Sequence, residues 1–437
     1  MMKKTIALFI AVLLILSLAA CGGNGNNTEV PGVTAETKPG DHIVMGKMDG
    51  EALHWTAVGA GVGTALLVAD NVIAYRAYNE EGNRLAAWKN SSVRAYLNGE
   101  FLTGAFTDAE REIIALTQTE TAAFDDNTYE TVTETAEDSV FLLSFREAAR
   151  YISPLEGFRF GIPTQAAAEA RIRMADVSES DTVTKACSWA LRDDGETFPQ
   201  NCMTIEGYSG KLSAIGETKT NPQGIRPAMW VYTDRALAEN WKNGTAELPA
   251  NEALDEKIAS LKVGDTVDFG SATLHSAELI CREVTWKVLD VTEDAVLIWS
   301  DVLLGYYKMG ADEDENVRWA NSEVRKYINS EDFINEYFDP WERAKIRTTH
   351  VVTCGSRPEW NIDGGEETDD KLFLLDREEL NKYWPDEASR GFEDDVYWLR
   401  SPDYTGGWFS CVIASGSLSQ NAASHYYGLR VAMWIEK

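Results

Sequence analysis

The sequence has few histidines, few cysteines and a shortage of basic residues. Only five histidines and six cysteines occur among 437 residues, and the histidines show no metal-ligand spacing. There are 40 Lys and Arg against 70 Asp and Glu, a net charge of -30. Such a surface repels phosphate backbones, so we expect no nucleic-acid partner. Gly-x-Ser-x-Gly and Gly-Lys-Ser/Thr signatures are also missing, and no residue is singled out as catalytic.

Apolar runs of membrane-spanning length are missing beyond the first segment. Lys3 and Lys4 precede an apolar stretch from Ile6 to Leu18, and Leu-Ala-Ala-Cys ends at Cys21. This segment resembles the lipobox of bacterial lipoproteins, which are cut before the cysteine and lipidated on it. The resemblance implies a signal peptide over residues 1–20, lipidation of Cys21 and an extracytoplasmic protein attached to the bacterial cell membrane. The alternative is an uncleaved membrane anchor. Residues 21–40, rich in Gly, Asn, Thr and Pro, predict a flexible tether.

The remaining chain contains one domain twice. A single constant shift places Trp55 on Trp286, and the pattern Trp-x-Asn-Ser-x-Val-Arg-x-Tyr-x-Asn begins at both Trp88 and Trp319. Two long copies indicate a domain duplication and not a solenoid, whose repeats are shorter. We predict a first domain over 41–232, a linker over 233–262 with a short helix, and a second domain over 263–437.

Each copy predicts a mixed α+β fold. Ser91 and Ser322 are predicted to cap helices whose apolar residues fall on one face. Residues 59–63 are rich in glycine but have strand-like flanks, so they predict a hairpin turn and not a phosphate loop. The first copy carries an insertion around residues 160–181. Helices therefore precede a loop-rich sheet in each copy.

Three motifs of the second copy are distinctive: Gly-Asp-x-Val-x-Phe-Gly at 264–270, Tyr-Trp-Leu-Arg-Ser-Pro at 397–402 and Gly-Leu-Arg at 428–430. Together they resemble a known family, the bacterial extracellular domain of unknown function 6273. The resemblance implies tandem copies of a surface domain with no established activity. The endings of the copies also resemble, less specifically, C-type-lectin-like folds, including the formylglycine-generating branch. One departure is that Asp193-Asp194 stands in the first copy where the second has Ser401-Pro402.

Aromatic and arginine residues divide into two predicted groups. Those that recur in both copies are expected to hold the fold: Trp55, Trp286, Trp88, Trp319, Arg94, Arg325, Arg192, Arg226 and Arg430. Those gathered near the end of the second copy are candidates for ligand binding, because aromatic faces beside polar groups suit sugars: Trp398, Arg400, Tyr404, Trp408, Tyr426 and Tyr427. The expected partner is a glycan or a surface protein.

Cysteines and acidic clusters supply weaker candidates. An exported chain can form disulfides, and Cys187 could pair with Cys202. Two adjacent thiolates could instead bind copper, as in formylglycine-generating oxidases. Acidic residues at 312–315, 363–370 and 393–395 could chelate calcium, although no EF-hand spacing occurs. No metal or other cofactor is otherwise expected.

The function that these features favour is binding or adhesion at the cell surface, where two copies could provide avidity. One alternative is an exported enzyme on the same scaffold, a hydrolase or a formylglycine-generating-like oxidase. A second is the solute-binding lipoprotein of a transporter. The duplication disfavours the transporter alternative, because such receptors consist of two interleaved α/β lobes.

Overall fold

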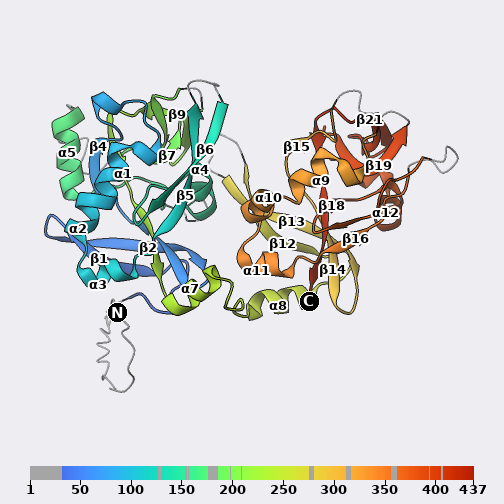
Figure 1. The fold of residues 1–437 in the computed structure, drawn as a ribbon, viewed down its shortest axis with the longest axis horizontal. Coiled ribbons are helices and arrows are strands. Elements are labelled where there is room, and N and C mark those ends of the chain that lie inside the picture. The colour runs from blue at the N-terminus through green and yellow to red at the C-terminus, as the bar shows by residue number, and fades with distance from the viewer. Residues whose placement is uncertain are drawn as a thin grey trace, which may run out of the picture.

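The computed structural model describes residues 32–437 except 126–129, 153–154, 156, 176–185, 197, 208, 275–279, 312–315, 356–361, 393 and 405–406. It forms two lobes that follow one another along the chain (Figure 1). Each lobe has its own hydrophobic core, one built from residues 43–231 and the other from residues 258–435, with no residue in common. Both lobes combine helices with several small sheets, as the sequence predicts, so the α+β class is confirmed.

The first lobe contains a four-stranded sheet and a five-stranded sheet. The four-stranded sheet has the order β1 (His42–Met48), β2 (Glu51–Gly61), β3 (Thr64–Ala69) and β11 (Ala228–Tyr232). The five-stranded sheet has the order β4 (Ala74–Ala77), β10 (Pro222–Ile225), β7 (Trp189–Asp194), β8 (Asn201–Ile205) and β9 (Leu212–Thr218). A separate hairpin pairs β5 (Thr117–Asp125) with β6 (Glu130–Asp138).

The second lobe repeats this plan with two five-stranded sheets. One has the order β12 (Thr266–Leu274), β13 (Ile280–Val291), β14 (Ala295–Ser300), β23 (Val431–Glu436) and β18 (Phe373–Leu374). The other has the order β15 (Tyr306–Tyr307), β22 (Tyr427–Gly428), β19 (Tyr397–Tyr404), β20 (Trp408–Val412) and β21 (Leu418–Ala422). The hairpin of β16 (Thr349–Val351) and β17 (Thr368–Asp370) is much shorter than β5–β6.

Short helices connect the sheets of each lobe. Those of the first are η1 (Glu81–Asn83), η2 (Trp88–Asn90), α1 (Ser92–Tyr96), η3 (Leu97–Phe101), α2 (Leu102–Ala105), α3 (Asp108–Ile113), α4 (Phe145–Glu147), η4 (Ala148–Ile152) and α5 (Gln165–Ala175). Those of the second are η5 (Trp319–Asn321), α9 (Glu323–Ile328), α10 (Glu331–Tyr337), α11 (Pro340–Lys345), α12 (Arg377–Tyr383) and η7 (Glu387–Ser389). Helix α5 lies in the insertion that the sequence predicts for the first copy.

Local sequence explains why these elements begin and turn where they do. The Ser91 and Ser322 side chains accept hydrogen bonds from the backbone N–H groups of Arg94 and Arg325, at 3.2 and 3.1 Å, so both predicted helix caps are confirmed. Val62 and Gly63 connect β2 to its antiparallel partner β3, which confirms the predicted hairpin, although its turn is shorter than predicted because Gly59, Ala60 and Gly61 belong to β2.

The segment between the lobes contains two helices, α7 (Arg235–Lys242) and α8 (Glu252–Ser260), where the sequence predicted one short helix. Ile258 of α8 is fully buried in the second core. The Asp255 carboxylate lies 2.6 Å from the Lys345 ammonium of α11, so α8 is docked on the second lobe. No helix among the described residues is long and apolar enough to cross a membrane.

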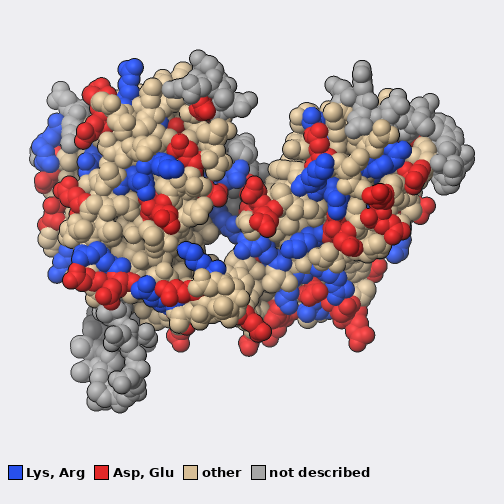
Figure 2. Space-filling model, viewed as in Figure 1, with Lys and Arg blue, Asp and Glu red and all other residues tan. Residues whose placement is uncertain are grey.

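The lobes also meet directly. In α4 of the first lobe, Arg146 Nη1 lies 3.3 Å from Glu336 Oε2 of α10. In η4, Arg150 Nη1 donates to the Glu336 carbonyl at 3.4 Å. Figure 2 shows the lobes joined in the lower part of the view and separated by an open space above it, with acidic side chains spread over both.

Candidate functional site

A buried carboxylate stands at the same place in each lobe. Asp138 accepts hydrogen bonds from the Trp88 indole at 2.8 Å, the Arg94 guanidinium at 2.5 Å and the Thr119 hydroxyl at 2.7 Å. Asp370 accepts the equivalent bonds at 2.8 and 2.7 Å from Trp319 and Arg325, and a third at 2.6 Å from the Thr368 hydroxyl of its own strand. The tryptophan and arginine donors therefore hold the β5–β6 or β16–β17 hairpin against the helices that follow Trp88 and Trp319.

Two further arginine centres recur. Arg192 binds Glu147 through both carboxylate oxygens and donates to the Leu142 carbonyl, and Arg400 makes the same contacts with Glu379 and Leu374. Each of these arginines is almost completely buried. The arginine of the Leu-Arg motif therefore has the same structural role in both copies. It connects the start of a helix to a central strand of the sheet.

The third arginine centre rests on aromatic rings. Arg226 lies 4.1 Å above the Phe158 ring, and Arg430 lies 3.5 Å above the Trp299 ring. Both donate to backbone carbonyls at the end of a neighbouring strand. Burial lowers the pKa of Arg226 to about 9. Trp55 and Trp286 lie in the two cores and donate to the Met45 and Phe269 carbonyls.

The predicted ligand-binding residues are not equally accessible. Trp398 and Arg400 are buried, so neither presents a surface to a ligand in this structure. Tyr427 is half-buried, with its ring 4.7 Å from that of Trp398 and its hydroxyl bonded to Asn421. Trp408 is 37% exposed and Tyr426 is 63% exposed. The side chain of Tyr404 lies outside the described residues.

Tyr426 belongs to a larger aromatic surface that sequence reasoning missed. Its ring centroid lies 6.5 Å from that of Tyr307, which stacks on Tyr327 with centroids 4.5 Å apart and planes 4° apart. Phe333 follows at 5.2 Å from Tyr327 and stacks on Tyr337 at 4.3 Å. We call Tyr426, Tyr307, Tyr327 and Tyr337 the tyrosine row; the last three are half-buried, and Phe333 is buried beneath them.

The scaffold fixes the tyrosine row from below. The buried Trp398 indole donates to the Tyr307 carbonyl at 3.0 Å, which ties β15 to β19. Desolvation, with the nearby Glu336 carboxylate, raises the pKa of Tyr327 and that of Tyr337, so both phenols stay neutral near pH 7. Glu336 also forms the ion pair with Arg146 of the first lobe, so the row extends toward the contact between the lobes. Helix α10, which carries its last member, lies on the side of the second lobe that faces the first (Figure 1).

The first copy has no such row at the equivalent place. Tyr75 pairs with Gly224 as Tyr306 pairs with Gly428, so Arg76 occupies the position of Tyr307. The Arg76 guanidinium lies 3.8 Å above the Tyr96 ring, where Tyr307 stacks on Tyr327. The repeat alignment already contained this difference, because it aligns Arg76 of the first copy with Tyr307 of the second in strands that otherwise match.

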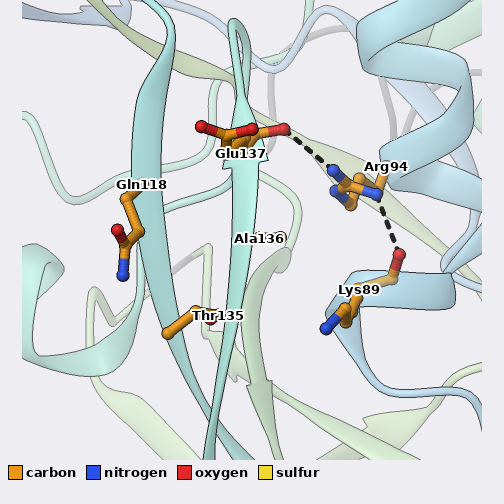
Figure 3. A pocket seen from close by; sticks show the side chains of 6 residues that line it. All are labelled: Lys89, Arg94, Gln118, Thr135, Ala136 and Glu137. Atoms are coloured by element: carbon orange, nitrogen blue, oxygen red, sulfur yellow. Dashed lines mark hydrogen bonds between the residues drawn. The ribbon is translucent and has the colours of Figure 1, made fainter.

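A shallow depression of about 470 Å³ lies in the first lobe between η2, α1 and the β5–β6 hairpin. Figure 3 shows Arg94 between Lys89 and Glu137, with Gln118 and Thr135 along the hairpin. Arg94 donates to both the Lys89 and the Glu137 carbonyls at 2.9 Å. Arg94 also forms an ion pair with Asp138, so its guanidinium already has partners within the fold.

The predicted disulfide is wrong, because strand register separates the two cysteines. Cys202 of β8 faces Asp194 of β7, whereas Cys187 precedes Trp189 at the other end of the same pairing. At about 3.3 Å per residue, these positions are roughly 20 Å apart, far beyond the Cα separation of about 6 Å that a disulfide needs. Both thiols are free and buried.

The register that excludes the disulfide also keeps the Cys187 and Cys202 thiols too far apart to bind one metal ion together. Burial raises the pKa of Cys187 to about 11 and that of Cys202 to about 12. Cys354 and Cys411 are free as well, with the pKa of Cys354 raised to about 11 and that of Cys411 to about 12, mainly by desolvation. Within the described ranges, no group of three or more His, Cys, Asp or Glu side chains could hold a metal ion. The acidic residues 312–315 lie outside those ranges.

Fold and site together define a tandem-domain α+β protein whose copies share a scaffold and differ in one aromatic surface. A family model described as a domain of unknown function (DUF6273) matches residues 62–233 and 293–437. Because these two segments cover most of the chain, the protein belongs to this family and carries two copies of its domain. No curated protein and no solved structure matches the chain.

Proposed function

We propose that this protein is a binding or adhesion lipoprotein of the bacterial cell surface and that it recognises glycans through the tyrosine row. The observation that carries the proposal is the row itself, in which the rings of Tyr426, Tyr307 and Tyr327 follow one another and the buried Phe333 ring links Tyr327 to Tyr337. Aromatic faces cover the C–H faces of pyranose rings, and neighbouring polar groups take the hydroxyls. The Glu336 carboxylate and the phenol hydroxyls supply such groups.

The remaining parts of the proposal come from the sequence. Lipidation of Cys21 would attach the chain to the cell membrane, and residues 21–40 would separate the lobes from the lipid surface. Cys21 lies outside the described residues. The resemblance of the last strands to C-type-lectin-like domains is consistent with carbohydrate recognition and is part of the same proposal.

Binding is favoured over the two alternatives by particular features. The register of β7 and β8 keeps Cys187 and Cys202 apart, which disfavours an oxidase that needs these two thiolates side by side. Each hydrophobic core is built from one continuous half of the chain. This arrangement supports tandem modules over the interleaved lobes of a transporter receptor.

The test is a glycan array probed with the purified full chain in detergent, once with calcium and once with a chelator. We expect binding that drops about tenfold or more in Tyr307→Arg, which gives the second copy the residue of the first, and in Tyr426→Ala. Arg76→Tyr, the matched change in the first copy, should bind like the unchanged protein. Loss of binding in chelator would assign calcium to the site.

Two results would contradict the proposal. A blank array in both buffers would reject glycans and leave surface proteins as the ligand class. Equal binding by Tyr307→Arg and the unchanged chain would show that the ligand does not use the tyrosine row.

A further inference from the structure

The first lobe contains a buried amine next to a buried carboxyl group. Lys219, directly after β9, is fully buried, and Asp194, at the end of β7, is 3% exposed. The Lys219 Nζ and Asp194 Oδ1 atoms lie 2.6 Å apart. Neither atom has any other polar partner among the described residues. The two polar atoms are thus held in contact with each other, away from water.

The second copy shows that the fold does not need this pair. The Lys219 backbone donates to the Gln200 carbonyl at 2.8 Å, and the Ala423 backbone donates to the Gly407 carbonyl at the same distance, so Ala423 occupies the position of Lys219. Asp194 faces Cys202 across β7 and β8. Pro402 faces Phe409 across β19 and β20 and takes the place of Asp194.

Replacing a buried ion pair by apolar residues is expected to keep or increase the stability of the fold. A buried ion pair loses so much hydration that well-packed apolar residues are often equally stable or more so. Pro402, Phe409 and Ala423 are such residues, and the second lobe keeps the same strand order around them. The amine and the carboxyl group of the first lobe therefore call for a role other than packing.

We propose that Lys219 and Asp194 join in an intramolecular amide bond that crosslinks β7 to the end of β9. The Nζ–Cγ bond forms and the Cγ–Oδ1 bond breaks. Two of the three ammonium protons end on Oδ1, which leaves as water, and the third remains on the amide nitrogen. The reaction needs no oxidant and no further reactant.

The surroundings favour this condensation in two ways. Burial raises the pKa of Asp194 to about 6, which increases the share of its neutral acid form, the form that an amine attacks. The second carboxyl oxygen, Oδ2, accepts a hydrogen bond from the Phe124 backbone N–H at 3.1 Å. This donor is placed to stabilise the negative charge that develops on Oδ2 when the amine adds.

The long β5–β6 hairpin supplies that donor only in the first copy. Phe124 lies near the outer end of β5, and the Ala122 N–H donates to the neighbouring Asp193 at 2.9 Å. The equivalent hairpin of the second copy, β16–β17, is three residues long on each strand. Asp194, Lys219 and the extended hairpin therefore occur together in the first copy, whereas the second copy has Pro402, Ala423 and a short hairpin at the matching places.

Peptide mapping of the purified full chain tests the proposal directly. After denaturation and trypsin digestion, we expect the peptide 193–211 to be joined to a peptide over 212–235 in which Lys219 is uncleaved, with the combined mass lower by one water. Fragment ions should place the branch between Asp194 and Lys219. Linear peptides 193–211 and 212–219 with unmodified side chains, recovered from the folded protein, would overturn the proposal.

Two variants control for folding and charge. Lys219→Arg keeps a cation beside Asp194 but lacks the primary amine, and Lys219→Ala supplies the residue that the second copy uses. Both should yield linear peptide 193–211 only. A mass loss of one water that persists on peptide 193–211 in either variant would assign the dehydration to another group and reject the crosslink.

Discussion

The two copies keep the same buried anchors and differ where their sheets reach the surface. Asp138 and Asp370 each bind a tryptophan, an arginine and a threonine with nearly the same distances. At the sheet edge, however, Arg76 covers Tyr96 in the first copy, whereas Tyr307 stacks on Tyr327 in the second. The contrast shows that the same anchors are compatible with different side chains at the sheet edge.

The second difference lies inside the lobes. The first copy uses a long hairpin and a buried Lys219–Asp194 pair, while the second uses a short hairpin and apolar residues at the same positions. Each copy thus serves as a natural control for the other. Substitutions that make the copies more alike, or that remove what they share, test which features belong to the fold and which to function.

The largest effect is expected from removing a shared anchor. Asp138→Ala leaves the Trp88, Arg94 and Thr119 donors without their carboxylate, and Asp370→Ala does the same in the second lobe. Loss of one partner from a buried charge network typically costs about 3–5 kcal/mol. We expect each change to lower the free energy of unfolding of its own lobe by that amount, measured by urea denaturation followed by tryptophan fluorescence.

The matched controls for this prediction are Asp138→Asn and Asp370→Asn, which keep one acceptor oxygen and should be milder. Because the two cores share no residue, the unchanged lobe should keep its own transition. Equal loss in both lobes after a single substitution would show that the lobes unfold as one unit.

A pH-dependent change in the free energy of unfolding is expected at the buried Lys219–Asp194 pair, which only the first copy has. In Lys219→Ala, Asp194 stays buried without its cation, so its pKa in the folded state is raised to at least about 6, above the ordinary value of about 4. The folded protein then binds the proton more tightly than the unfolded chain. The free energy of unfolding is greatest below pH about 4 and falls by roughly 3 kcal/mol as the pH rises through about 6.

The double variant Lys219→Ala with Asp194→Ala isolates this effect, because it has no carboxyl group to titrate. Its unfolding free energy should lack the fall between pH about 4 and about 6 that Lys219→Ala shows. Parallel pH profiles of the two variants, measured by chemical denaturation, would contradict the assigned role of the buried Asp194.

A smaller and equal effect is expected at a glycine that both copies require. Gly46 and Gly270 have φ values of +78° and +76°, and an added Cβ would lie 2.8 Å from the ring of Phe106 or Phe338. Alanine at either site adopts an unfavourable backbone conformation and presses on that ring, at a cost of about 1–3 kcal/mol. Thermal melts of Gly46→Ala and Gly270→Ala should show similar decreases, and a large difference would mean that one lobe can shift its ring.

Sequence alone predicted the duplication, the α+β class, the helix caps and the hairpin after β2, because each depends on local patterns. It did not reveal the register of β7 and β8, which places Cys202 opposite Asp194 and excludes the disulfide. It also singled out Trp398 by type, although the structure buries this residue beneath Tyr427. Burial and register depend on contacts between distant segments, so a pattern of residue types does not determine them.

The tyrosine row lay within reach of sequence analysis only through the repeat. Tyr307 and Tyr327 are far apart in the chain, and no periodicity connects them. Their positions align with Arg76 and Tyr96, so the repeat predicts that the two pairs occupy matching places, but the contact within each pair is visible only in the structure. Tyr426 and Tyr337 join them through loop and helix packing that only the structure shows.

The smallest energetic effect is expected at the contact between the copies. Arg146 is 62% exposed and its ion pair with Glu336 is 3.3 Å long, so the pair contributes at most about 1 kcal/mol. Arg146→Ala should leave the urea midpoint almost unchanged but allow the lobes to separate, which would increase the radius of gyration in X-ray scattering. High salt should produce the same increase in the unchanged protein, because it screens an exposed pair. If neither treatment changes the scattering, other contacts between the lobes, such as that of Arg150 in η4 with the Glu336 carbonyl, hold them together.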